Sequence, residues 1–165
     1  MEINRKMSLA WAGLLAMGVG LVGVGAPVDA AGPGIVASAT GSGHFFIGED
    51  LRTFAFTART SAGGETKGEA TVNNRSQGIV SHLKIDCLDV SGNIATMAGY
   101  ISASSNPDIV GQYAIFRVVD NGEGGKAASP DLLSLVFFRV SPPYDCTLDY
   151  VIALNPVARG NIQVH

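Results

Sequence analysis

The strongest constraint on the fold is a two-residue alternation of apolar and polar side chains after residue 43. Between Ile79 and Cys87 the odd-numbered positions are apolar or small, and the positions between them are mostly polar. A period of two places successive side chains on opposite faces of a strand, so this segment predicts a half-buried antiparallel strand. The same alternation predicts that Cys87 faces inward and that His82 lies on the polar face.

Turn-forming residues divide the rest of the chain into about eight segments of this kind. The turn segments lie at 62–64, 91–93, 106–108, 120–125 and 142–143. Evenly spaced short strands without a convincing amphipathic helix predict an all-β fold, either a small antiparallel β-barrel or a closed β-sandwich. Alternation is the same in these two architectures, so the sequence leaves the choice between them open.

The N-terminus predicts a signal peptide over residues 1–30. Two basic residues precede an uncharged stretch from Met7 to Val28, and small residues lead to a cleavage site after Ala30. A retained membrane anchor is the alternative, because the uncharged stretch is long enough to span a bilayer. Four glycines and Pro27 weaken a helix there. We therefore expect a secreted or cell-surface protein with no membrane insertion after the signal peptide is removed.

The exported part is predicted to contain a flexible arm and one domain. Residues 31–43 are small, uncharged and rich in glycine, a composition typical of an irregular segment. Residues 44–165 are then expected to form a single all-β domain.

The chain has two cysteines, Cys87 and Cys146. An even number of cysteines in an exported chain predicts one disulfide. Two free buried thiols are the alternative. A zinc site is disfavoured, because two isolated cysteines without a C-x-x-C pair do not supply four ligands.

Charge and motifs exclude several classes of function. Eleven Lys and Arg residues against fourteen Asp and Glu residues give a net charge of −3, which predicts no nucleic-acid partner. The chain carries no Gly-x-Ser-x-Gly motif, and its three histidines have no metal-ligand spacing. These observations favour a non-catalytic protein without a cofactor.

One strand carries a candidate ligand site. Arg52 shares a predicted strand face with Phe54 and Phe56, so its guanidinium would lie at the mouth of the barrel or sandwich and could bind an anion. His82 is included in this candidate set. The alternative is an ion pair between Arg52 and a carboxylate such as Asp50, Asp86 or Asp120.

A second candidate site is a calcium site in the glycine-rich loop after residue 119. Asp120, Asn121 and Glu123 supply oxygen atoms within four residues, and Asp131 could complete the set. The alternative is a polar loop in which Asp and Asn side chains accept hydrogen bonds from nearby backbone groups.

Several short motifs follow one another in a single order over nearly the whole exported part. They are Gly41-Ser-Gly-His44, Arg52-Thr-Phe-Ala-Phe56, Asn74-Arg75 with Gly78, Cys87-Leu-Asp-Val-Ser-Gly-Asn93, Asp120-Asn-Gly-Glu-Gly124, Pro130-Asp131 with Ser134, and Gly160-Asn-Ile-Gln-Val164. The ordered set resembles a family of small secreted bacterial domains with no established activity. This resemblance implies a compact all-β domain and assigns no chemistry to any residue.

Together these features predict a secreted, non-catalytic binding or interaction domain whose partner is an extracellular protein, a glycan or a small molecule. The first alternative is a lipocalin-like barrel that holds a small apolar or anionic ligand. It requires an interior void beside Phe54 and Phe56. The second alternative is an enzyme with a dispersed site in a calycin-like barrel. It requires a histidine or carboxylate within hydrogen-bond reach of Arg52 in a cleft.

Overall fold

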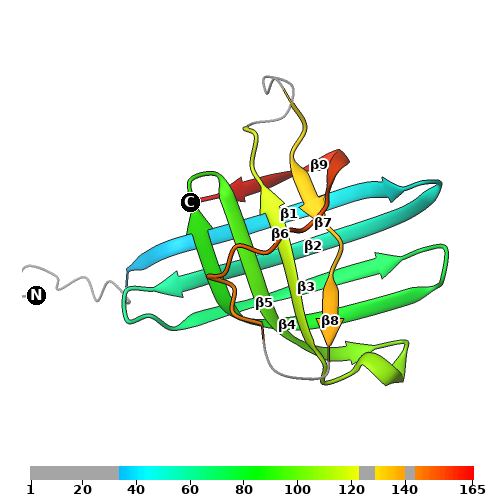
Figure 1. The fold of residues 1–165 in the computed structure, drawn as a ribbon, viewed down its shortest axis with the longest axis horizontal. Helices are drawn as coiled ribbons and strands as arrows, with labels where there is room; N and C mark the ends of the chain where they lie inside the picture. The colour runs from blue at the N-terminus through cyan, green and yellow to red at the C-terminus, as the bar shows by residue number, and fades with distance from the viewer. Residues whose placement is uncertain (1–33, 123–128, 140–143) are drawn as a thin grey trace, which may run out of the picture. The chain divides into compact units, whose positions relative to one another are not determined.

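The computed structural model describes residues 34–122, 129–139 and 144–165. Their regular elements are strands and one short 3₁₀ helix (Figure 1). In chain order they are β1 (Ile35–Ile47), β2 (Asp50–Ser61), β3 (Thr66–Asn74), β4 (Ile79–Ser91), β5 (Ile94–Ser104), the helix η1 (Pro107–Ile109), β6 (Tyr113–Val119), β7 (Leu132–Ser134), β8 (Phe137–Arg139) and β9 (Leu154–Val164). The predicted all-β class is confirmed, and the predicted signal peptide lies outside the described residues.

The strands form one antiparallel sheet that closes on itself. Their order is β5-β4-β3-β2-β1-β9-β7-β6-β8, and a further pairing of β5 with β6 joins the two sides of the sheet. The short strands β7 and β8 both pair with β6, at its end and its start respectively, so they act as one interrupted strand. The result is a ring of about eight strand positions, as expected for a small closed barrel.

Strand β1 begins earlier than the sequence predicted. Residues 35–43, which we assigned to a flexible arm, belong to a strand that pairs with β2, and residues 39–43 pair with β9 as well. Their small side chains have a packing role here. At Gly41 an added Cβ would lie 2.7 Å from the Phe56 ring and 3.0 Å from Ile162, so glycine lets these two side chains meet above it. A run of small residues therefore reflects close packing inside a strand and not an irregular segment.

A β-bulge in β4 overturns the predicted orientation of Cys87. Ile85 pairs with Gly99, and Cys87 pairs with the next residue, Ala98, so Asp86 is an extra residue in the strand. One extra residue reverses the alternation that follows it. Cys87 consequently lies on the outside of the barrel, and the inward positions continue with Leu88 and Val90.

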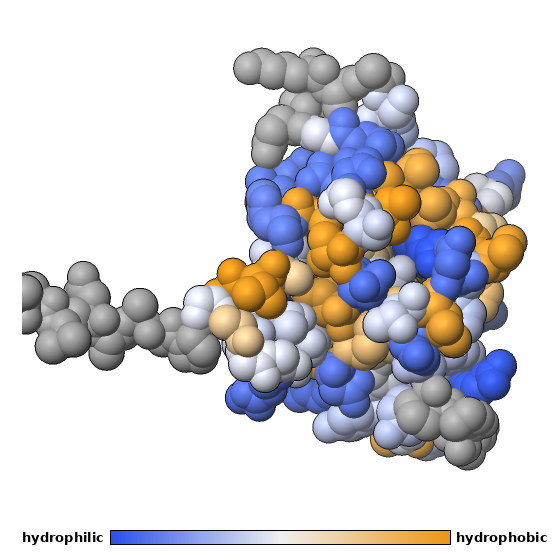
Figure 2. All heavy atoms as spheres, turned by 60° about the vertical axis from the view of Figure 1, so that its left-hand side comes forward, coloured by the Kyte–Doolittle hydropathy of each residue, from blue (hydrophilic) through white to orange (hydrophobic). Residues whose placement is uncertain are grey.

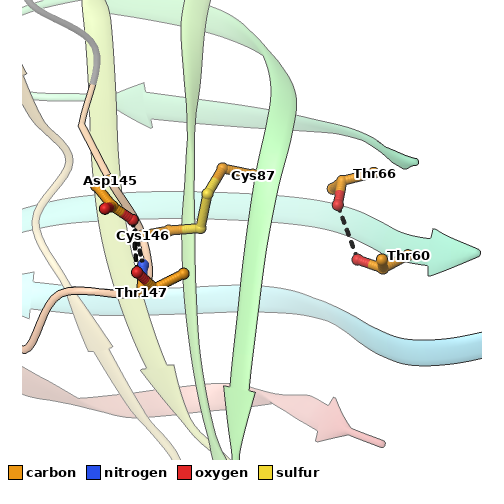
Figure 3. Close-up of a disulfide and its surroundings, with 6 residues drawn as sticks. All are labelled: Thr60, Thr66, Cys87, Asp145, Cys146 and Thr147. Atoms are coloured by element: carbon orange, nitrogen blue, oxygen red, sulfur yellow. Dashed lines mark hydrogen bonds between the residues drawn. A yellow bond between two sulfur atoms is a disulfide. The ribbon is translucent and has the colours of Figure 1, made fainter. Parts of the chain in front are cut away.

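The predicted disulfide between Cys87 and Cys146 is present, on the outer face of the sheet. It ties the segment that precedes β9 to strand β4 (Figure 3). Tyr144 and Tyr150 from this segment pack with the disulfide in an outer hydrophobic cluster. Arg117 on β6 holds the same segment, since its Nη1 donates to Asp149 Oδ1 and to the Tyr150 carbonyl, each at 3.0 Å.

The core lies inside the barrel. Four phenylalanines contact one another there, with ring centroids 5.7 to 6.2 Å apart. They are Phe45, Phe54, Phe56 and Phe116. Apolar side chains from β1, β5, β6 and β9 fill the half of the interior beyond them, among them Ala39, Met97, Val118 and Ile162.

The outer surface is mixed in character. On the face shown in Figure 2, apolar areas are divided by polar residues. Exposed apolar side chains include Ile35 and Val36 at the start of β1 and Leu148 and Val151 in the segment before β9. In the part of the chain that the structure describes, no helix has the length and apolar character needed to cross a membrane.

Candidate functional site: a cavity at one end of the barrel

The barrel encloses a cavity of about 200 Å³. Its walls come from the inward positions of strands β1 to β6 and from residues 133–136. The four core phenylalanines line it together with aliphatic side chains such as Leu83 and Ile101. The interior is therefore partly hollow, and the walls of the cavity are mainly apolar.

The cavity reaches the surface where β3 ends and β4 begins. Gln77 and Phe138 line it and are also exposed to solvent, so they mark its mouth. The helix η1 places Ile109 against the same opening, and Ile109 is buried. Asn106 caps this helix by accepting the backbone N–H of Asp108 at 3.1 Å, which fixes the loop beside the mouth.

Arg52 lies at this mouth, as the sequence predicted. Its side chain is 19% exposed, and it is the one charged side chain among the described residues that line the cavity. The predicted alternative, an ion pair with Asp50, is present only at the outer limit of such contacts: Nη2 lies 3.9 Å from Asp50 Oδ2, beyond hydrogen-bond distance. Arg52 Nε is buried and has no hydrogen-bond partner in the structure.

Asn74 is the neutral partner of Arg52. The two residues face each other in the pairing of β2 with β3, and Asn74 is buried. With the amide oxygen of Asn74 turned toward Arg52, it accepts from Nη1 at 3.2 Å and from Nη2 at 3.3 Å, and its nitrogen donates to Ser76 Oγ at 2.8 Å. This orientation is favoured because the opposite one places amide N–H groups against guanidinium N–H groups.

The structure brings together three of the four residues predicted to bind a ligand. Arg52, Phe54 and Phe56 all line the cavity. His82 does not: it is exposed on the outer face of β4, where its Nδ1 lies 3.0 Å from Thr71 Oγ1. Its separation from Arg52 follows from the alternation of β4, which turns Leu83 inward and His82 outward.

A dispersed catalytic site would require a histidine or carboxylate within hydrogen-bond reach of Arg52. His44 lies beside Phe46, with ring centroids 5.9 Å apart, and neither residue is among those that line the cavity. No histidine, aspartate, glutamate or cysteine occurs among the described lining residues. The hydroxyl groups of Ser81 and Ser134 therefore have no general base beside them in the cavity.

Sequence reasoning missed several lining residues. Phe45 was detectable, because it continues the same alternation in β1 that was recognised in β2. Asn74, Ile109 and Phe138 gave no such signal, since they come from the end of a strand, a short helix and an interrupted strand. Their contribution depends on how the barrel closes.

The predicted calcium ligands have other partners in the described part of the loop. Asp131 accepts the backbone N–H groups of Asn121 at 2.9 Å and Ile162 at 2.8 Å. Asp120 accepts those of Gly122 at 2.8 Å and Val164 at 3.0 Å. These contacts match the hydrogen-bonding alternative. Glu123 lies outside the described residues, and within them no group of three or more His, Cys, Asp or Glu side chains could hold a metal ion.

Two carboxyl groups outside the cavity have shifted pKa values. Partial burial raises the pKa of Asp86 at the bulge, and a hydrogen bond with its own backbone opposes this effect. The hydroxyl and the backbone N–H of Thr147 both donate to Asp145, at 2.7 and 3.0 Å, and lower the pKa of Asp145 (Figure 3). Neither group lines the cavity, so neither takes part in binding there.

The arrangement can enclose a small, mainly apolar molecule. It offers an apolar chamber with one cation and a few neutral amides at its mouth. Comparison of the chain with models of protein families, with curated proteins and with solved structures found no match.

Proposed function

We propose that this domain binds a small, largely apolar molecule inside its barrel. The observation that carries the proposal is the cavity of about 200 Å³ between the core phenylalanines and the mouth at Arg52. Apolar cavities of about 150 Å³ stay dry and bind benzene in other proteins. The cavity is therefore large enough for one ring with a short substituent.

The energetics favour an apolar occupant. Removing apolar surface from water contributes about 25 cal/mol per Å², and a preformed rigid cavity requires little reorganisation on binding. The walls come from hydrogen-bonded strands, so the cavity exists before a ligand enters. A ligand that fills it also restores contacts that the surrounding side chains lack.

The experiment is a titration of the disulfide-intact protein with toluene and indole, followed by calorimetry and thermal unfolding. At ten times the dissociation constant, binding should raise the midpoint of unfolding by about 4 °C. Absence of heat and of any thermal shift with both probes would overturn the proposal.

A cavity-filling variant localises the binding. Ala70 is buried and lines the cavity, so Ala70→Leu places an isopropyl group inside it. We expect toluene binding to weaken at least tenfold while the protein remains folded. Ala103→Leu, on an exposed position of β5, is the matched control and should bind as the wild type does.

The proposal includes export from the cytoplasm. The Cys87–Cys146 disulfide is compatible with an oxidising compartment, where such bonds persist. Residues 1–30 carry the pattern of a cleaved signal peptide. The mass of the protein recovered from the culture medium tests this: it should correspond to a chain that begins at residue 31. A full-length, cell-retained chain would contradict export.

A further inference from the structure

Resting on that proposed function, we infer that the ligand is a compact monocarboxylate. Its carboxylate would bind Arg52 at the mouth, and its apolar body, about the size of one aromatic ring, would lie among Phe45, Phe54 and Phe56.

Arg52 lacks a hydrogen-bonded carboxylate among the described residues. Its side chain is 19% exposed, and a largely buried charge is normally paired by a hydrogen-bonded carboxylate. Among the described residues, the carboxylate in range is that of Asp50, whose Oδ2 lies 3.9 Å from Nη2 and whose side chain is 45% exposed. Arg52 therefore has only a long, partly solvent-exposed ion pair at the entrance of an apolar chamber.

The guanidinium has more N–H groups than Asn74 uses. With its amide oxygen turned toward Arg52, Asn74 accepts one N–H from each terminal nitrogen, at 3.2 Å from Nη1 and 3.3 Å from Nη2. Each terminal nitrogen carries a second N–H, which can donate a charge-assisted hydrogen bond to a carboxylate oxygen. Because Nε is buried, the ligand would bind at the terminal nitrogens.

The charge balance favours a monoanion. Among the described lining residues, Arg52 supplies the one positive charge, and the other polar groups at the mouth, Asn74, Gln77 and Asn106, are neutral. A single guanidinium matches the single charge of a carboxylate. A phosphate monoester carries nearly two charges and requires more donors than this site offers.

The size and the walls of the cavity select the body of the ligand. A volume of about 200 Å³ holds a ring with a short side chain and excludes a long acyl chain. The phenylalanine rings already contact one another in stacked and edge-to-face arrangements, and another aromatic ring can join them in the same geometry.

The test compares phenylacetate with phenylacetamide, its neutral counterpart of nearly equal shape, by calorimetry on the disulfide-intact protein at pH 7. We expect phenylacetate to bind at least tenfold more tightly. Palmitate should bind more weakly than phenylacetate. Equal affinity of the acid and the amide would overturn the carboxylate inference and leave the proposed function intact, whereas no binding of either compound or of toluene would overturn both. Tighter binding of palmitate would overturn the size limit.

Variants of Arg52 identify the selecting residue. Arg52→Gln should weaken phenylacetate binding at least tenfold and change phenylacetamide binding less than twofold, which also shows that the cavity is still formed. Arg52→Lys keeps the charge without the planar guanidinium and should give an intermediate loss. Arg59→Gln, on the exposed face of the same strand, is the matched control and should bind as the wild type does. An unchanged affinity of Arg52→Gln for phenylacetate would overturn the role of Arg52.

Discussion

The carboxylate of Asp131 accepts the backbone N–H of Ile162 at 2.8 Å, across 31 residues of sequence. Strand β7 pairs with only the first part of β9, from Leu154 to Pro156, so the N–H groups farther along β9 need other acceptors on that side. Asp131 and Asp120 supply them, at Ile162 and Val164. Two side chains thus complete the wall of the barrel where the paired strand is too short.

Replacing Asp131 by asparagine tests this role. Asparagine keeps the shape but presents an N–H₂ group to one of the two backbone N–H groups, which leaves a buried donor without an acceptor. We expect the free energy of unfolding to fall by about 2 kcal/mol or more. Urea denaturation measures it. Asp108→Asn, at an exposed position of the helix η1, is the control, and equal midpoints for the two variants would contradict the role of Asp131.

Ser134 performs a related function where β7 is interrupted. Ser134 is 1% exposed, and its hydroxyl accepts the backbone N–H of Arg117 at 2.8 Å and donates to the Leu135 carbonyl at 2.8 Å. Ser134→Ala leaves both backbone groups without this partner, and we expect a loss of about 1–3 kcal/mol in the free energy of unfolding. Hydrogen exchange at the Arg117 amide should accelerate. Unchanged protection of that amide would contradict this account.

The disulfide closes a loop with a sequence separation of 59 residues. In the chain-entropy description, such a link destabilises the unfolded chain by about 4 kcal/mol. The double variant Cys87→Ser/Cys146→Ser should lose stability of that order in urea denaturation. The reduced wild type should unfold at the same urea concentration as the variant. A variant as stable as the oxidised wild type would show that the link does not stabilise the fold.

Hydrogen bonds from Thr147 lower the pKa of Asp145. The hydroxyl and the backbone N–H of Thr147 donate to the carboxylate, so the pKa of Asp145 is lower in the folded protein than in the unfolded chain. This stabilisation is present above the unfolded pKa and is lost as the pH falls through the folded pKa. Thr147→Val removes the larger contribution, and the pKa of Asp145 should rise toward its ordinary value in an NMR titration.

Thr147→Ser is the control for that titration. Serine keeps the donating hydroxyl, and the pKa of Asp145 should then remain close to that in the wild type. If valine and serine shifted the pKa of Asp145 equally, the hydroxyl would not be its cause.

Local patterns were sufficient to predict most of the fold. The alternation in β2 correctly placed Arg52, Phe54 and Phe56 on one inward face, because a regular strand has a strict period of two. It failed for Cys87, because a bulge adds one residue and no local signal marks Asp86 as the extra one. The disulfide was predicted by compartment and cysteine number, which do not depend on orientation.

The candidate site was harder to predict than the fold. Arg52 could be assigned to a mouth, but its amide partner Asn74 comes from a different strand and depends on the register of β2 with β3. The void itself is a property of the closed ring, because it depends on how far side chains from eight strand positions reach toward one another. Small residues such as Gly41 appear flexible in a sequence and prove to be packed once Phe56 lies above them.

The extra residue at Asp86 also keeps the disulfide apart from the cavity. It turns the sulfur atom of Cys87 away from the lumen, so the covalent link lies against Tyr144 and Tyr150 on the exterior. An oxidant or reductant that acts on the sulfur atoms therefore does not have to pass through the chamber, and a molecule that occupies the chamber does not meet them. Changes in redox conditions would make or break the disulfide that attaches the outer segment to β4. They would not react with the side chains that line the chamber or with the guanidinium of Arg52.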